Sequence, residues 1–138
     1  MAIYHCHCQV ISRGQGRSAV AAAAYRSGEK ITNSYDGVTH DYRKKKGIVY
    51  KEIMLCENAP EEWKDRALFW NNIEQAERDT AARLAREFEI ALPVELSTEE
   101  QIDFVRAFVH ENFVNIGMCA DFAIHDKGDG NPHCHILL

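Results

Sequence analysis

The sequence lacks the features of a secreted or membrane-spanning protein. No apolar run in its 138 residues approaches the roughly 20 residues that a membrane-spanning helix needs. The N-terminal stretch MAIYHCHCQV has no basic segment followed by an apolar one, so it does not resemble a secretory signal. The five cysteines are an odd number without such a signal, which favours free thiols over a disulfide framework. We therefore expect a cytoplasmic protein.

The chain also lacks the excess of positive charge that is typical of nucleic-acid-binding proteins, since its formal net charge is -5. The charge is unevenly distributed, however. Residues 1–51 hold nine Lys and Arg against three Asp and Glu, a net +6, whereas residues 52–138 hold seven against eighteen, a net -11. A basic N-terminal part can contact phosphates while the acidic part faces solvent or a metal ion. Net charge therefore neither excludes nor supports DNA as a partner.

Hydropathy patterns predict one domain over residues 1–138, because no repeat, low-complexity tract or linker interrupts the chain. Alternation and helical periodicity predict the following elements: strands at 2–11, 47–55, 86–92, 118–125 and 133–138, a turn at 35–37, and helices at 19–30, at 60–84 and between Ser97 and Gly117. Ser18 is the expected N-cap of the first helix, and Ser97 with Glu100 forms the capping-box pattern of the third. This order favours an α+β sandwich, a mainly antiparallel sheet with helices packed on one face.

The tract HCHC at residues 5–8 contains four residues of types that bind zinc. Strand alternation places His5 and His7 on one face and Cys6 and Cys8 on the other, so the four cannot converge on one ion. We expect the two cysteines to be small core residues, which leaves the two histidines for the active face.

Three histidines near the end of the chain form a stronger pattern. His133 and His135 are two residues apart on a predicted strand, so both side chains leave the same face. His125 ends the preceding strand, and the short glycine-containing connection DKGDGNP allows the two strands to pair as a hairpin. Three neutral imidazoles that converge in this way can hold a divalent metal ion with coordination positions left open, which is typical of a catalytic site.

The stretch HDKGDGNPHCHILL resembles the signature of MobA/MobL (MobQ-type) relaxases, which belong to the HUH endonucleases. Further similar stretches are AIYH, SAVAAAAYRSGEK, HDYRKKKGIVYKEIML, ENAPEEWKDRALFWNNIE, REFEIALPVEL and GMCADFAIHDKGDGNPHCHILL. The sequence departs from the pattern at Cys134, where a bulkier apolar residue usually separates the histidine pair. It also stops three residues after His135, whereas complete relaxase domains continue with further helices, so we expect a domain truncated at its C-terminal end.

The resemblance implies an HUH-like fold and a DNA-nicking activity. Tyr25 matches the family's nucleophile, which cleaves one strand at a plasmid transfer origin, stays attached through a 5′-phosphotyrosyl bond and can rejoin the strand. The three histidines would hold Mg²⁺ or Mn²⁺, and the partners would be single-stranded DNA at the origin and other mobilisation or conjugation proteins. A tyrosine on an alanine-rich helix would otherwise be interpreted as a core residue.

The acidic and basic partners of this site are less specific. Glu87 and Glu89 share a strand face, and either could assist Tyr25 or the histidines. Asp121 falls on the same strand face as His125 and is expected to orient an imidazole. The candidate phosphate contacts are Arg13, Arg17, Arg43, Lys44, Lys45 and Lys46.

Two other functions fit the histidine pattern. Rolling-circle replication initiators share the HUH chemistry, but they generally carry the tyrosine after the histidine pair, whereas Tyr25 comes before it. A non-catalytic module stabilised by a metal ion could also bind DNA or protein. Chelation distinguishes this module from an enzyme. Removal of a structural metal should unfold the domain, whereas removal of a catalytic metal should leave it folded and inactive.

Overall fold

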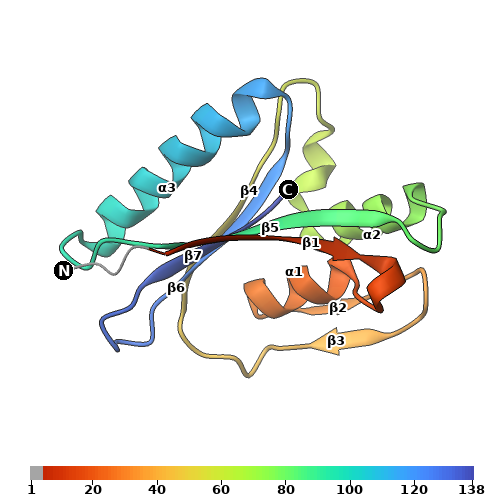
Figure 1. Cartoon of the computed structure of the whole chain (residues 1–138), viewed down its shortest axis with the longest axis horizontal. Helices are drawn as coiled ribbons and strands as arrows, with labels where there is room; N and C mark the ends of the chain where they lie inside the picture. Colours follow the sequence, from red (N-terminus) through yellow and green to blue (C-terminus); the bar gives the residue numbers. More distant parts are fainter. Residues whose placement is uncertain (1–4) are drawn as a thin grey trace.

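The computed structural model describes residues 5–138, which form a five-stranded antiparallel sheet with helices on both of its faces (Figure 1). The strand order is β1-β5-β7-β6-β4. The strands are β1 (Cys6–Ser12), β4 (Ile48–Met54), β5 (Arg83–Ala91), β6 (Ala120–His125) and β7 (His133–Leu137). The predicted α+β class and mainly antiparallel sheet are confirmed. The start of the first predicted strand, at residues 2–4, lies outside the described residues.

The sequence predicted that all helices pack on one face of the sheet, and this prediction is wrong. Helices α1 (Ala19–Ser27) and α2 (Arg66–Ala76) pack on one face, and α3 (Thr98–Asn112) covers the other (Figure 1). The reason is that the central strands are apolar on both sides. In β7, Leu137 belongs to the core under α1 and α2, whereas its neighbour Ile136 belongs to the core under α3. Both faces therefore have to be covered.

The helix ends follow the predicted signals. The Ser18 side chain accepts a hydrogen bond from the Ala21 amide at the start of α1, and Gly28 ends this helix at φ +67°. Ser97 and Glu100 form the full capping box at the start of α3. The remaining helical turns are three 3₁₀ segments, at Arg13–Gln15, Glu61–Lys64 and Val114–Ile116.

The region between residues 29 and 84 differs most from prediction. The expected turn at 35–37 lies between two short paired strands, β2 (Lys30–Thr32) and β3 (Thr39–Asp41). The predicted helix over 60–84 is wrong in its length: a 3₁₀ turn precedes it and α2 ends at Ala76. Asp65 causes the break, because it has an extended backbone and its side chain caps Leu68 N at 3.2 Å.

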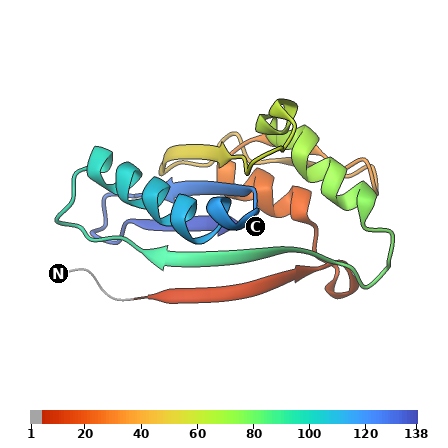
Figure 2. The same ribbon diagram turned by 90° about the horizontal axis from the view of Figure 1, so that it is seen from above.

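The expected burial of Cys6 and Cys8 is also wrong, since both side chains are exposed. Their strand, β1, lies at the edge of the sheet (Figure 2). The core cluster around α3 contains no residue of β1, so nothing in that cluster covers this strand. Within residues 5–138, no helix is long and apolar enough to cross a membrane.

Candidate metal centre and nucleophile

The β6–β7 hairpin brings the three histidines together as predicted. His125 and His133 are directly opposite each other in the antiparallel register, and His135 lies one step further along the same face. One ring nitrogen from each residue lies within 4.8 Å of the others. The ring centroids are 4.7 Å apart for His125 and His135 and 5.0 Å apart for His133 and His135. This is a compact three-nitrogen site.

Burial favours the neutral form of His125 and His135, and backbone carbonyls orient His125 and His133. Burial is the main cause that lowers the pKa of His125 to about 4, and burial also lowers the pKa of His135. His125 Nε2 lies 2.9 Å from the carbonyl oxygen of Arg26, and His133 Nδ1 lies 3.0 Å from that of Asn131. Because a carbonyl only accepts, each bonded nitrogen carries the proton and the ring's lone pair lies on its other nitrogen. Neutral, oriented imidazoles are the form that binds divalent metal ions, so the three histidines fit a divalent metal ion.

Glu87 lies beneath His135 on the adjacent strand. Its Oε1 is 3.6 Å from His135 Nδ1, and this nitrogen has no hydrogen-bond partner among residues 5–138. Arg26 donates two hydrogen bonds to the same carboxylate, at 2.7 and 3.2 Å, and Gln9 donates another. Burial would raise the pKa of Glu87, but His135 and Arg26 outweigh it and lower the pKa to about 2. A carboxylate this acidic is a poor proton acceptor for a phenol, so its place is behind the histidine.

Glu89, the other glutamate that the sequence left open, is directly opposite His135 in the register of β5 and β7. We predict that Glu87→Gln weakens Mn²⁺ binding about 10- to 100-fold, because the negative charge behind His135 is lost. The matched control is Glu89→Gln, which removes the same charge from the same strand face and should change the Kd much less. Isothermal titration with Mn²⁺ measures both. Equal losses in the two variants would contradict the assignment.

Tyr25 lies on the exposed side of α1, with 42% of its surface accessible. The ring meets the edge of Tyr42 at 5.0 Å between centroids, and Lys45 Nζ lies 3.6 Å from its centroid. An open groove beside it is basic; the lining side chains are Tyr25, Asp41, Tyr42, Lys44, Lys45, Lys46 and Lys127. A second groove, lined by Arg17, Arg26, His40 and Glu87 among others, also reaches Tyr25.

Not all of the predicted phosphate contacts are free to bind DNA. Arg13 donates to the carbonyl oxygens of Glu74, Glu77 and Asp79 and so fixes the chain that leaves α2. Arg43 forms an exposed ion pair with Asp41. Lys44, Lys45 and Lys46 line the first groove, and Arg17 lines the second groove while donating to Gln9.

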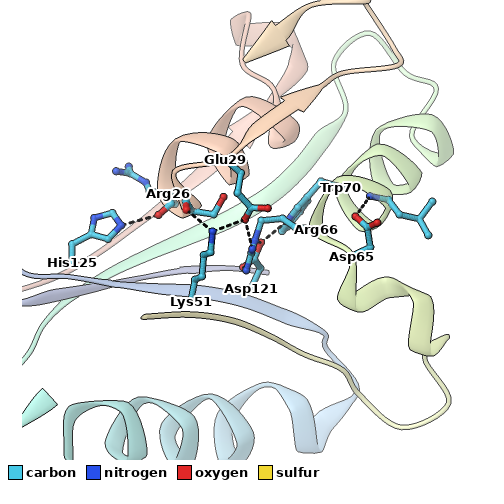
Figure 3. Close-up of polar contacts among 10 residues, drawn as sticks. Arg26, Glu29, Lys51, Asp65, Arg66, Trp70, Asp121 and His125 are labelled. Atoms are coloured by element: carbon cyan, nitrogen blue, oxygen red, sulfur yellow. Dashed lines mark hydrogen bonds and ion pairs between the residues drawn. The ribbon is translucent and has the colours of Figure 1, made fainter. Parts of the chain in front are cut away.

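The role expected for Asp121 is not the one that the structure gives it. Its carboxylate accepts two hydrogen bonds from Arg66 and one from Trp70 Nε1, all at 2.8 Å (Figure 3). Arg66 also pairs with Glu29, at the end of α1. Asp121 therefore ties α2 and α1 to the sheet instead of orienting an imidazole.

Two residues of the site were not predicted from the sequence. Arg26 pairs with Glu87 through its side chain. The carbonyl oxygen of Arg26 accepts a hydrogen bond from His125 (Figure 3). Its position next to Tyr25 was the available signal. Lys127 joins the basic groove from the loop after β6, and its place two residues after His125 was the corresponding signal.

A model of the MobA/MobL family matches residues 17–138. The chain belongs to this family. The matched segment includes Tyr25, the lysines at 44–46 and all three histidines, and the predicted resemblance is confirmed.

Relatives of this MobA/MobL chain include proteins named for conjugation and mobilisation. It is 40% identical to a conjugal transfer protein TraA of Rhizobium radiobacter, over 99% of this chain and 13% of the relative. It is 41% identical to the mobilisation protein MobL of Acidithiobacillus ferridurans, over 100% of this chain and 42% of the relative. The chain thus spans less than half of the length of either relative.

A solved structure has the same fold as this MobA/MobL chain. The structure comes from work on vancomycin-resistance transfer in Staphylococcus aureus, and the TM-score is 0.92 at 34% sequence identity. The match covers 99% of this chain and 69% of the solved one. Because identity and fold agree over nearly all of the chain, this chain and the solved structure share the sheet and helices described above.

Proposed function

We propose that this chain is the nicking part of a plasmid-mobilisation relaxase, with Tyr25 as its nucleophile. The observation that carries the proposal is the link between Tyr25 and the histidine cluster. The residue after Tyr25 accepts a hydrogen bond from His125 through its carbonyl oxygen. This hydrogen bond joins the helix that carries the exposed phenol to the three-histidine site, and the phenol lines a basic groove.

The chemistry requires no external energy source. The Tyr25 oxygen forms a bond to phosphorus while the bond from phosphorus to the 3′-oxygen breaks. The phenol proton goes to solvent or a base, and the leaving 3′-oxygen gains one. The product is a 5′-phosphotyrosyl bond and a free 3′-hydroxyl, and the reverse reaction rejoins the strand. A divalent ion, Mg²⁺ or Mn²⁺, on His125, His133 and His135 would supply positive charge to a bound phosphate.

The substrate in this proposal is single-stranded DNA at a transfer origin. Lys44, Lys46 and Lys127 in the basic groove are suited to backbone phosphates, since lysine ammonium groups attract them without regard to sequence. Arg17 in the second groove provides a further cationic contact. Other mobilisation or conjugation proteins are the expected protein partners.

Two alternative functions are less well supported. A rolling-circle initiator would carry its tyrosine after the histidine pair, whereas Tyr25 precedes it. A non-catalytic metal module gives no reason for an exposed tyrosine that is bordered by two grooves.

The proposal is tested with single-stranded oligonucleotides that span the plasmid's transfer origin, labelled at the 5′ end in one arm and the 3′ end in the other. With Mg²⁺ or Mn²⁺, we expect a denaturation-resistant protein adduct that carries the 3′ label only. EDTA should prevent the adduct, and the circular dichroism spectrum should show that the protein stays folded. Unfolding on chelation would instead indicate a structural metal, and an adduct that carries the 5′ label would reverse the polarity.

A further inference from the structure

The basic segment of residues 42–47 is fixed between the nucleophile helix and the histidine cluster. At one end the Tyr42 amide donates to the carbonyl of Glu29, just after α1, at 3.1 Å. At the other end the amide of Asp126, next to His125, donates to the carbonyl of Gly47 at 2.8 Å. A hydrogen bond from the Lys45 amide to the Tyr42 carbonyl closes a turn between these ends. The segment therefore presents its side chains to Tyr25 from a defined position.

Lys45 differs from its neighbours in this segment. All three lysines line the groove, but Lys44 and Lys46 are exposed whereas Lys45 is half-buried. Its Nζ donates to the carbonyl oxygen of Tyr25 at 2.9 Å and lies 3.6 Å from the centroid of the Tyr25 ring. The ammonium thus contacts the tyrosine at two places, its backbone and the face of its ring.

The geometry points to Lys45 as a positioning residue for Tyr25. This inference rests on the proposed function, since it requires Tyr25 to be the nucleophile. The hydrogen bond to the carbonyl and the contact with the ring fix the lysine against one face of the phenol, and Tyr42 packs against the same ring in a T-shaped pair. A cation over an aromatic face attracts it electrostatically. The attraction increases as the phenol loses its proton, so Lys45 favours the deprotonated oxygen that attacks phosphorus over the neutral phenol of the ground state.

The surroundings of Lys45 agree with this role. Burial, with repulsion from Arg26 and Lys127, lowers the pKa of Lys45 to about 8, while Glu87 acts in the opposite direction. The lysine thus remains mostly charged near neutral pH, but its ammonium is partly stripped of water. A desolvated cation interacts more strongly with a ring than a hydrated one does.

The alternative is that Lys45 is one more phosphate contact like Lys44. The two roles predict different kinetics. A phosphate contact contributes to DNA affinity, whereas a residue that positions the nucleophile contributes to the rate once DNA is bound. Lys45→Met keeps most of the side-chain volume and removes the charge, and Lys45→Arg restores the charge.

The experiment measures the single-turnover adduct rate at saturating transfer-origin oligonucleotide and the Kd by fluorescence anisotropy, on the full chain. For Lys45→Met we expect the saturating rate to fall about 10- to 100-fold with the Kd within about threefold of wild type. Lys45→Arg should recover most of the rate. Lys44→Met should instead raise the Kd, and Lys64→Met, a distant exposed lysine paired with Glu61, should change neither quantity.

If Lys45→Met raises the Kd for DNA and leaves the saturating rate at the wild-type value, the inference is overturned, because a phosphate contact would behave in this way. Failure of Lys45→Arg to recover any rate would also overturn it, provided that circular dichroism shows both variants folded. Tyr25→Phe is measured in parallel. If Tyr25→Phe retains adduct formation, the proposed function itself fails. If it abolishes the adduct while Lys45→Met keeps its rate, only the role of Lys45 is wrong.

Discussion

Tyr25→Phe should eliminate the covalent adduct with DNA and lower strand cleavage by at least about 10³-fold, because no other group replaces a nucleophile that forms the covalent bond. The substitution removes one oxygen atom from a ring that is 42% exposed. The ring contacts with Tyr42 and Lys45 remain possible, so the fold and DNA affinity should be retained. Denaturing gels measure the adduct, and anisotropy measures binding.

The matched control is Tyr42→Phe. Tyr42 lies edge-on to Tyr25 and lines the same groove, so it is the tyrosine most able to substitute for Tyr25. Its variant should keep the covalent adduct. If Tyr42→Phe loses the adduct and Tyr25→Phe keeps it, the nucleophile has been assigned to the wrong tyrosine of this pair.

Arg66→Met should be the most destabilising of the substitutions considered, at about 3–5 kcal/mol, because it leaves the buried carboxylate of Asp121 without its charge partner. Both side chains are buried, and two 2.8 Å hydrogen bonds join them (Figure 3). The loss also removes the contact from Arg66 to Glu29 at the end of α1. Urea unfolding followed by circular dichroism measures the change in the free energy of unfolding.

Two comparisons separate the buried pair from a general charge effect. Lys64→Met removes one partner of an exposed ion pair with Glu61 and should cost at most about 1 kcal/mol. The double variant Arg66→Met/Asp121→Asn removes both charges and retains an oxygen that can accept from Trp70, so it should be more stable than Arg66→Met alone. An Arg66→Met variant as stable as Lys64→Met would show that the buried pair does not hold α2 to the sheet.

The histidine cluster could be predicted from sequence because it depends on local structure. His133 and His135 share a face through strand alternation, and a short connection returns the chain beside His125. The capping signals at Ser18 and Ser97 are local in the same sense. Both kinds of prediction need only residues within one turn or one hairpin of each other.

The other contacts join residues that are distant in sequence. The pair between Arg66 and Asp121 spans 55 positions, and strand alternation alone gave Asp121 the same face as His125. Alternation likewise could not distinguish Glu87 from Glu89. Only the packing of α1 on the sheet, which brings Arg26 to Glu87, separates the two glutamates.

The burial errors have a related cause. Cys6 and Cys8 have the alternating pattern of a half-buried strand, but the depth of a strand face depends on which helix covers it. The strand order places β1 at the sheet edge, outside the core under α3. Within the basic segment, the sequence offered no reason to distinguish Lys45 from Lys44 and Lys46. In the structure, a turn closes between Lys45 and Tyr42, and the Lys45 ammonium contacts Tyr25.

The most direct test is to identify the residue that carries the DNA. The covalent adduct formed with Mn²⁺ would be digested with nuclease and protease and its peptides analysed by mass spectrometry. We predict a nucleotide attached through phosphate to the tyrosine in the peptide that contains Tyr25, and no modified peptide from a His135→Ala variant or from a reaction with EDTA. A nucleotide on any other residue, or an equal yield of the Tyr25 adduct in the presence of EDTA, would contradict a metal-dependent attack by Tyr25.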